Sequence, residues 1–458
     1  MRRVLIVAYP FPPEGGASVK RTLKFIKYLP ELGWDPIVLT VKNGNHRDHD
    51  LSLLKMINRN VRIYRAFTPE TLLKGDGQRK EKVVGVDQQK EKVSRTRGAV
   101  KKMWRAAYHL IGDYVGIPDA HILWLPYAFL KGIQIIFKFK CVVIYATGPT
   151  FTDHVVGLLL KKATGRSLVV DFRDAWVANP SYRANRKLKR KVEGLLEKRV
   201  ILGADVVVST TSGISEDFKR RYPQANPDKF ITITNGFDPE DFPSSPKDRR
   251  EKGRFRIVHT GILAFERSPK FFLQALRKMI DEQPGLEGEI EVVFVGKNLR
   301  FDDNKEIEDY INEMNLWKAV QVKGFMSRAE SLVYQQSADV LLLIIGIVPE
   351  EFLQTYGLSG KAFDYAISGK PVLALAQDGA TAEFVKKTNI GIVIPPDNVD
   401  MIKNTLKEFY HVFKSKGLIV KRKEEQMEKY NLRFLTGELA RDFDVCPFPH
   451  RKRGKGGA

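Results

Sequence analysis

A short stretch in the last third of the chain brings together residues that can bind an anion and a diol. TYGLSGKAFDYAISGKPVLALA, residues 355–376, places Gly360 and Lys361 where a helix is expected to begin. The first N–H groups of a helix and a lysine ammonium can converge on a phosphate. Asp364, one turn later, can accept two hydrogen bonds, which suits the vicinal hydroxyls of a ribose. The alternative is a surface ion pair between Lys361 and Asp364.

Two glycine turns after expected strands offer related chemistry. The first strand ends in AYPFPPEGGASVKR, where Gly15 and Gly16 precede a helix and leave backbone N–H groups accessible to an anion. The second half begins with FRIVHTGILAFERSP, where Gly261 follows a strand and Arg267 precedes a Ser-Pro helix start. A simple tight turn would use the same glycines, and Arg267 could equally be an exposed cation.

The elements that would position these residues follow a regular α/β pattern. In the first half, apolar strands such as VLIVAY, CVVIYAT and SLVVDF alternate with amphipathic helical stretches, and the second half repeats this rhythm. Continuous apolar strands separated by helices are typical of a parallel sheet that is covered on both faces. We therefore expect two doubly wound, Rossmann-like α/β domains that face a cleft.

Composition marks the expected domain boundaries. Residues 242–254, FPSSPKDRREKGR, are rich in Pro, Ser and charge, as is typical of an interdomain linker. We expect an N-terminal domain over residues 1–245 and a C-terminal domain over 246–415. A helical segment over 416–445 is expected to pack back toward the N-terminal domain, and the basic tail over 446–458 is expected to be disordered.

The chain is strongly basic. Among its 458 residues, 76 Lys and Arg stand against 54 Asp and Glu, and this formal charge of +22 predicts an anionic partner. Much of the charge lies in an insertion at about residues 70–110, which is either a solvated loop or a patch for an anionic membrane face. A second basic stretch, residues 183–199, has helical spacing. We expect its cations to stay in water and its apolar residues to face inward; these are Leu188, Val192, Leu195 and Leu196.

Cysteine usage and hydropathy exclude several classes of protein. Cys141 and Cys446 have no ligand spacing, so neither a disulfide framework nor a zinc site is expected, which suits a reducing compartment. The N-terminal apolar run is only about six residues long and lacks a cleavage signal, so we expect a buried strand there. No apolar stretch reaches the roughly 20 residues of a membrane span, because lysines interrupt the nearest one. We expect a protein that is soluble or peripherally bound to a membrane.

Several motifs in sequence order give the chain a family resemblance. They are FPPEGGASVKR, DFRDAW at 171–176, TNGFDPEDF at 234–242, HTGILAFERSP at 259–269, GKAFDYAISGKPVLA and GIVIPP. With these motifs the chain resembles, over nearly its whole length, the retaining glycosyltransferases of family 4 (glycosyl transferases group 1). The resemblance implies the two-domain GT-B fold and transfer of a sugar from a nucleotide-diphosphate donor to a hydroxyl acceptor. It also implies retention at the anomeric carbon and no obligatory metal or other cofactor.

The resemblance assigns roles in a C-terminal, nucleotide-sugar-binding domain. Arg267 stands where the family usually has a lysine that stabilises the leaving diphosphate, and Lys361 with the amides after Gly360 would add to this effect. Asp364 matches the second acid of the family's E-x7-E pattern, which holds the donor ribose. The other expected donor-site residues are the turn glycines Gly15, Gly16 and Gly261.

Three residues of the N-terminal domain are expected on the acceptor side by the same resemblance. ATGPTFTDHVVGLLL places His154 early in a helix, where it is expected to take part in catalysis, and Arg173 and Asp174 follow a strand in DFRDAW. A lone helical histidine is more often structural. Arg173 and Asp174 could equally form a buried ion pair that holds a loop.

Two positions depart from the family pattern. Tyr356 occupies the place of the first glutamate of E-x7-E, and Glu350 and Glu351 are the nearest acids. Ile262 follows the strand-end glycine, where the family has an arginine. Both departures bear on the choice of donor sugar and on activity.

These observations leave three functions to weigh. The first is a cytoplasmic glycosyltransferase, bound to an anionic leaflet through its basic segments, that builds a cell-surface polysaccharide or glycolipid. The second is a nucleotide-sugar 2-epimerase, which uses the same architecture but needs no acceptor. The third is a non-catalytic binder of nucleic acid or another anionic polymer. It rests on net charge alone, because the basic stretches show little aromatic interleaving for stacking on bases.

Overall fold

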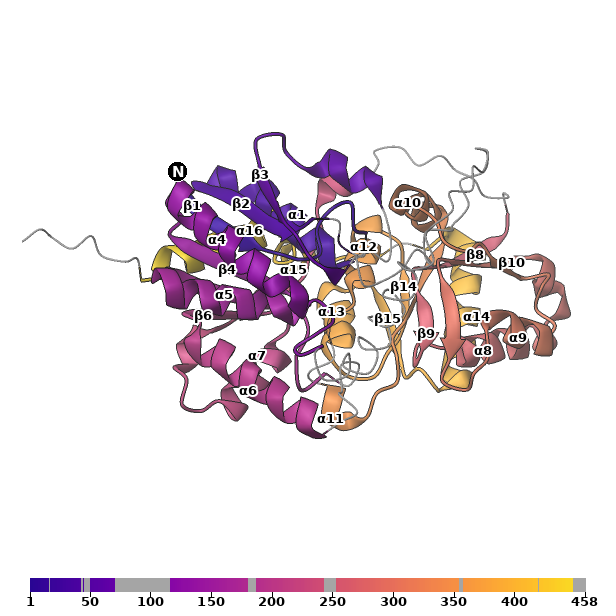
Figure 1. Cartoon of the computed structure of the whole chain (residues 1–458). Helices are drawn as coiled ribbons and strands as arrows, with labels where there is room; N and C mark the ends of the chain where they lie inside the picture. The colour runs from indigo at the N-terminus through magenta and orange to yellow at the C-terminus, as the bar shows by residue number, and fades with distance from the viewer. Residues whose placement is uncertain are drawn as a thin grey trace, which may run out of the picture. The chain divides into compact units, whose positions relative to one another are not determined.

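The chain folds into two compact units, shown in a computed structural model (Figure 1). Unit 1 comprises Met1–Thr232 and Thr436–Ala458, and unit 2 comprises Ile233–Leu435. The structure describes residues 1–15, 17–42, 44, 50–70, 116–179, 187–242, 253–353, 357–418 and 420–447. Most of the predicted basic insertion, and the predicted tail after Pro447, lie outside the described residues.

Unit 1 is built on a parallel sheet of seven strands in the order β3-β2-β1-β4-β5-β6-β7. β4 and β5 are buried along their whole length, as expected for strands that are covered on both faces. The order reverses between β1 and β4, so the carboxyl ends of these two strands mark the point where open α/β sheets bind ligands. The strands are β1 (Arg2–Val7), β2 (Trp34–Val41), β3 (Arg62–Ala66), β4 (Val143–Gly148), β5 (Ser167–Phe172), β6 (Val206–Ser209) and β7 (Phe230–Thr232).

Helices cover both faces of this sheet. Apolar residues of α4, α5, α6 and α7 join one core with the strands, while α1 and α16 lie on the opposite face. On that opposite face, Phe25 and Phe443 contact the ring of Tyr145 at centroid distances of 6.2 and 5.8 Å. The helices are α1 (Ala17–Tyr28), α4 (Leu125–Phe139), α5 (Phe151–Thr164), α6 (Lys187–Gly203), α7 (Ser212–Arg221) and α16 (Leu432–Val445), with short 3-10 turns at Leu29–Leu32, Leu51–Met56, Ile122–Trp124 and Pro227–Lys229.

Among the described residues, one helical stretch, which lies in unit 1, is long and apolar enough to cross a membrane by length and composition alone. It spans the 18 residues Ile122–Phe139 and has a mean hydropathy of 1.3. In this fold the stretch comprises α4 and the turn before it. Ala128, Gly132, Ile135 and Ile136 of α4 are buried.

Unit 2 repeats the architecture with a parallel sheet in the order β12-β10-β8-β13-β14-β15 and a separate pair, β11-β9. The order of the main sheet reverses between β8 and β13, which places the expected ligand edge at their carboxyl ends. The two units confirm the predicted pair of doubly wound parallel α/β domains. The strands are β8 (Phe255–Thr260), β9 (Leu263–Phe265), β10 (Ile290–Val295), β11 (Asn298–Phe301), β12 (Val320–Val322), β13 (Val340–Ile344), β14 (Val372–Leu375) and β15 (Gly391–Ile394).

The helices of unit 2 pack on both faces of its sheet and form two apolar cores. They are α8 (Lys270–Glu282), α9 (Ile307–Glu313), α10 (Arg328–Ser337), α11 (Glu350–Leu353), α12 (Gly360–Ser368), α13 (Ala380–Thr388), α14 (Val399–Lys416) and α15 (Glu424–Glu428), with 3-10 turns at Pro239–Asp241 and Pro284–Gly288.

The compact units divide at different residues from the predicted domains. The expected boundary at 245 lies among residues 243–252, outside the described part of the chain. Residues 233–242 belong to unit 2, because Phe237 exchanges backbone hydrogen bonds with Tyr430 and Leu432. The predicted segment 416–445 is shared: the chain returns to unit 1 at Thr436, within α16, and Phe443 then packs against Trp34.

Candidate functional site

The predicted glycine turn of unit 2 lies at the carboxyl end of β8. Gly261 follows this strand with φ of +112°, in the left-handed region that favours glycine. The Lys361 side chain crosses over it, since a Cβ built on Gly261 would lie only 2.4 Å from Cε of Lys361. The absence of a side chain at residue 261 therefore makes room for the lysine.

Lys361 is held by two acceptors. Nδ1 of His259 lies 2.9 Å from the carbonyl oxygen of Leu342. Because a carbonyl can only accept, Nδ1 carries the proton and Nε2 is the acceptor. The Lys361 ammonium lies 3.3 Å from this Nε2 and 3.1 Å from the carbonyl oxygen of Ile262. Two of its N–H groups can thus bond to protein, which leaves the third for a ligand.

The surroundings of Lys361 weaken its hold on the proton. Loss of contact with water and the nearby positive charge of Arg267 lower the pKa of Lys361 from 10.5 to about 7. Burial and the charge of Lys361 lower the pKa of His259 well below its usual range, so this imidazole is neutral. Strongly shifted groups of this kind are typical of functional sites. Gly261, Arg267 and Lys361, three predicted residues, are therefore close neighbours.

A small pocket lies at the same edge of the sheet, lined by the loops after β13 and β14 and the start of α13. Two contacts connect it to the predicted residues. The backbone N–H of Ser359 donates to Oγ1 of Thr381 in the pocket wall, over 3.1 Å. Glu266, the neighbour of Arg267, packs so closely on Gly346 of the wall that a Cβ there would lie 2.1 Å from Cγ of Glu266.

The start of α12 is accessible among the described residues. Ser359 precedes this helix and makes no capping hydrogen bond through its side chain. A Cβ at Gly360 would meet no atom within 4 Å. The N–H groups of Gly360 and Lys361, at the start of α12, can therefore face a ligand, an arrangement that suits a phosphate, whereas the N–H group of Ala362 donates to the backbone oxygen of Ser359. Tyr356, which replaces the expected acid, lies outside the described residues.

Asp364 has a partner that the sequence motif did not reveal. Arg328, at the start of α10, donates two hydrogen bonds to the Asp364 carboxylate, at 2.8 and 3.1 Å, and lies 3.4 Å from Asp241. The alternative ion pair between Lys361 and Asp364 is not formed, since Lys361 bonds to His259 and Ile262. The Asp364 carboxylate is therefore held in place by an arginine from a neighbouring helix.

In unit 1, the structure places His154 inside the core. The ring is fully buried and stacked on Phe172 at a centroid distance of 4.3 Å, and Nε2 lies 3.2 Å from the backbone oxygen of Asp171. Burial lowers the pKa of His154 from 6.5 to about 4, so the imidazole is neutral near pH 7. These contacts favour a structural role, and the expected part in catalysis stays a prediction.

Arg173 holds the loop that leads into α5. Its guanidinium donates to the backbone oxygens of Gly148 and Pro149, at 2.9 and 2.6 Å, and the side chain is largely buried. Asp174 is next to it and adds a negative charge that acts on the Arg173 guanidinium. The backbone bonds of Arg173 fit the alternative that this side chain holds a loop, and the acceptor-side role expected for both residues stays a prediction. Gly15 lies in the loop between β1 and α1, and Gly16 lies outside the described residues.

Comparison with known proteins bears on the fold of the chain. Residues 254–411 match the family model described as glycosyl transferases group 1. No curated protein sequence matches the chain significantly. Among solved structures, HepE from Anabaena in complex with UDP is similar at 16% identity and a TM-score of 0.62, over 97% of this chain and 100% of that one. Sucrose-phosphate synthase from Thermosynechococcus elongatus is similar at 15% identity and a TM-score of 0.61, over 97% and 98%.

The chain has the GT-B fold. A third similar structure, a putative UDP-N-acetylglucosamine 2-epimerase from Listeria monocytogenes, has 10% identity and a TM-score of 0.52, over 96% of this chain and 95% of that one. At such low identity these likenesses establish the fold alone. The GT-B fold is thus common to both enzyme classes that the sequence suggested, and the site must decide between them.

Proposed function

We propose that the protein is a retaining glycosyltransferase, which moves a sugar from a nucleotide-diphosphate donor to a hydroxyl acceptor. The observation that carries the proposal is the Lys361 ammonium over Gly261, beside Arg267 and the open start of α12. These residues lie within the segment that matches glycosyl transferases group 1. The HepE structures contain UDP and UDP-glucose, so uridine donors are the first to test.

The chemistry follows from the charges at this edge of unit 2. When the bond between the sugar and the diphosphate breaks, negative charge grows on the leaving oxygen. Lys361, Arg267 and the N–H groups of α12 can stabilise that charge, so the proposal requires no metal ion. Asp364, oriented by Arg328, would accept hydrogen bonds from the donor ribose.

The biological setting that we propose is cell-surface polysaccharide or glycolipid synthesis in the cytoplasm. It is motivated by the sequence resemblance and by the two buried, unpaired cysteines, which suit a reducing compartment. The acceptor would be the hydroxyl of a glycan or of a lipid-linked sugar.

The proposal is tested by release of nucleoside diphosphate from a panel of nucleotide sugars, with and without acceptor extracts. Lys361→Ala should slow transfer by on the order of 10² to 10³, because a donor to the leaving group is lost. Asp364→Asn should mainly raise the donor KM. Lys318→Ala, an exposed lysine in the same unit, is the matched control. Unchanged transfer by both site variants would refute the assignment of the donor site.

A second candidate function is nucleotide-sugar 2-epimerisation, because the putative epimerase from Listeria monocytogenes has a similar fold. The two reactions have different products. An epimerase converts the free nucleotide sugar without an acceptor, whereas a transferase releases nucleoside diphosphate and forms a glycoside. Proton NMR of the products separates them, and the anomeric coupling of a new glycoside reports whether configuration is retained.

A further inference from the structure

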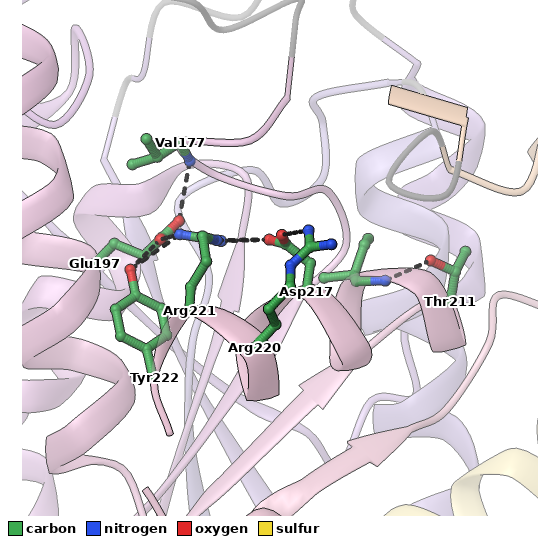
Figure 2. A network of polar contacts seen from close by, with 8 residues as sticks. Val177, Glu197, Thr211, Asp217, Arg220, Arg221 and Tyr222 are labelled. Carbon is green, nitrogen blue, oxygen red and sulfur yellow. Dashed lines mark hydrogen bonds and ion pairs between the residues drawn. The ribbon is translucent and has the colours of Figure 1, made fainter. Parts of the chain in front are cut away.

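α6 turns its acidic residues toward the protein and exposes three of its leucines, Leu188, Leu195 and Leu202. Glu193 and Glu197 are buried, together with Val200 and Ile201. Glu197 accepts hydrogen bonds from the backbone of Val177, from Arg221 and from the hydroxyl of Tyr222 (Figure 2). The expectation that the apolar side chains of this helix all face inward was therefore wrong for Leu188 and Leu195. The inward face is fixed by the charged network around Glu197.

The outward face of α6 combines leucines with cations. Leu188, Leu195 and Leu202 are 63%, 49% and 39% exposed. Their spacing of seven residues places them in one stripe along the helix, because seven residues make almost two full turns. Five exposed cations lie on this helix: four of them, Lys187, Lys191, Lys198 and Arg199, flank the stripe, and Arg190 lies toward the opposite side.

These five cations have no ion-pair partner among the described residues, whereas Lys189 approaches Glu193 at 4.0 Å. Both acids of the helix are buried, so its outer surface carries only positive charge. A surface leucine is ordinary when it stands alone, but three in a stripe form an apolar strip. Such a strip between cations is the pattern of a helix that lies in the interface of an anionic bilayer.

A second helix of the same layer exposes similar side chains. α5 packs between α4 and α6 in the same layer of unit 1 (Figure 1). α4 exposes Leu130 and Phe137, at 62% and 59%, and its sequence LPYAFLKGIQIIFKF contains lysines but no acid. Two helices of one layer thus share the combination of exposed apolar side chains with unopposed positive charge.

We propose that the outer face of α6, together with the exposed side chains of α4, is the surface by which unit 1 binds an anionic lipid bilayer. The leucines would enter the boundary between headgroups and acyl chains, and the cations would contact the anionic headgroups. A nucleic acid or an acidic protein would pair with the cations only. Its polar surface would offer no apolar contact to the leucine stripe. The inference is independent of the proposed transferase activity, because vesicle binding requires no donor.

The test is flotation of the full chain with vesicles of phosphatidylcholine, with and without phosphatidylglycerol. The parent should bind the anionic vesicles and release them as salt rises. A variant with Leu188, Leu195 and Leu202 changed to Gln should bind at least tenfold more weakly while its charge is unchanged; Gln preserves helix propensity. Replacement of the five cations by Gln should lower the affinity for anionic vesicles by roughly fivefold for each cation near the surface, and so remove the preference for them. Met401→Gln and Ile392→Gln, at exposed positions of unit 2, are the controls.

A second measurement locates the contact. Both native cysteines are buried, so an introduced cysteine is the accessible labelling site among the described residues. An environment-sensitive fluorophore at Leu195→Cys should shift to shorter wavelength on anionic vesicles. The same label at Lys318→Cys should not shift. Equal vesicle binding by the leucine variant and the parent would overturn the proposal. It would also be overturned by a parent that binds heparin or DNA but no vesicles.

Discussion

At the scale of single residues, the candidate site depends on a lysine whose charge is adjustable near neutral pH. Lys361 keeps its proton only up to about pH 7, because the loss of water and the nearby Arg267 charge oppose protonation and lower its pKa. A diphosphate brings the counter-charge that favours the protonated form. Ligand binding and proton uptake are therefore coupled.

This coupling predicts how UDP binding depends on pH. The parent should bind UDP more tightly than Lys361→Ala does. The ratio of the two affinities should be largest below pH 7, where the lysine is charged. It should fall by up to tenfold per pH unit above 7, as the lysine loses its proton. Isothermal titration calorimetry with UDP between about pH 6 and 9 measures both affinities. Their ratio is not affected by the protonation of UDP itself, whose phosphate has a pKa near 6, because both proteins bind the same ligand. A ratio that is independent of pH would contradict this account.

A second prediction at this scale concerns Gly261. In Gly261→Ala the new Cβ would lie 2.4 Å from Cε of Lys361, so the lysine must move. UDP affinity should fall as far as it does in Lys361→Ala. Stability should fall by only about 1–3 kcal/mol, the cost of the left-handed backbone, because the end of a lysine is flexible. Gly285→Ala, where the new Cβ would meet nothing within 4 Å, should change neither urea unfolding nor UDP titration.

At the scale of elements, α6 shows how a tertiary network overrides an apolar pattern. The leucines of this helix are numerous enough to suggest an inward face, yet the buried Glu197 sets its rotation. Its partners, Val177, Arg221 and Tyr222, come from outside the helix. The rotation is thus determined by residues up to 25 positions away in sequence.

This network predicts a difference between two adjacent residues of α6. Glu197→Gln keeps the size of the side chain but replaces a charged acceptor of three donors by an amide. It should lower the free energy of unfolding by about 1.5–3 kcal/mol. Lys198→Gln, on the exposed face, should change it by less than about 0.5 kcal/mol. Urea unfolding followed by circular dichroism measures both, and equal stabilities would show that the network does not fix the helix.

The difference between local sequence patterns and tertiary contacts also explains how much of the site the sequence predicts. Gly261, Arg267 and Lys361 could be found because each follows a strand or begins a helix, and such positions meet at one sheet edge. Arg328 could not, because it lies 36 residues from Asp364 and only the packing of α10 brings it close. His259 was also missed, since a histidine inside an apolar strand carries no spacing signal. Strands, helices and turn residues are thus predictable, whereas the partners that orient them depend on tertiary contacts.

At the scale of the whole molecule, unit 2 is a continuous segment between two parts of unit 1. The first 232 residues form the sheet of unit 1, and Thr436 begins the part of α16 that completes it. There, Phe443 contacts the rings of Trp34 and Tyr145, and Nε1 of Trp34 donates to Asp444 over 3.2 Å. α16 is therefore part of the core of unit 1.

This arrangement predicts the effect of truncation. A chain that ends at Asn431 lacks α16 and should expose Trp34 to water. Unit 1 should then lose several kcal/mol of stability, at roughly 1.5–3 kcal/mol for each buried apolar side chain removed. Tryptophan fluorescence and thermal unfolding report the change. A chain that ends at Pro447 keeps α16 and is the control, and equal melting of the two chains would contradict the role given to α16.

The late return of the chain to unit 1 also has a consequence during translation. Trp34 and its partner Asp444 are separated by 410 residues. At roughly 5–20 residues per second, a ribosome needs about 20–80 s to make that length. For this period the nascent first domain presents an apolar face that its own helix will later cover. Chaperones that hold such faces on the ribosome should therefore bind this chain early and leave it only after α16 has emerged.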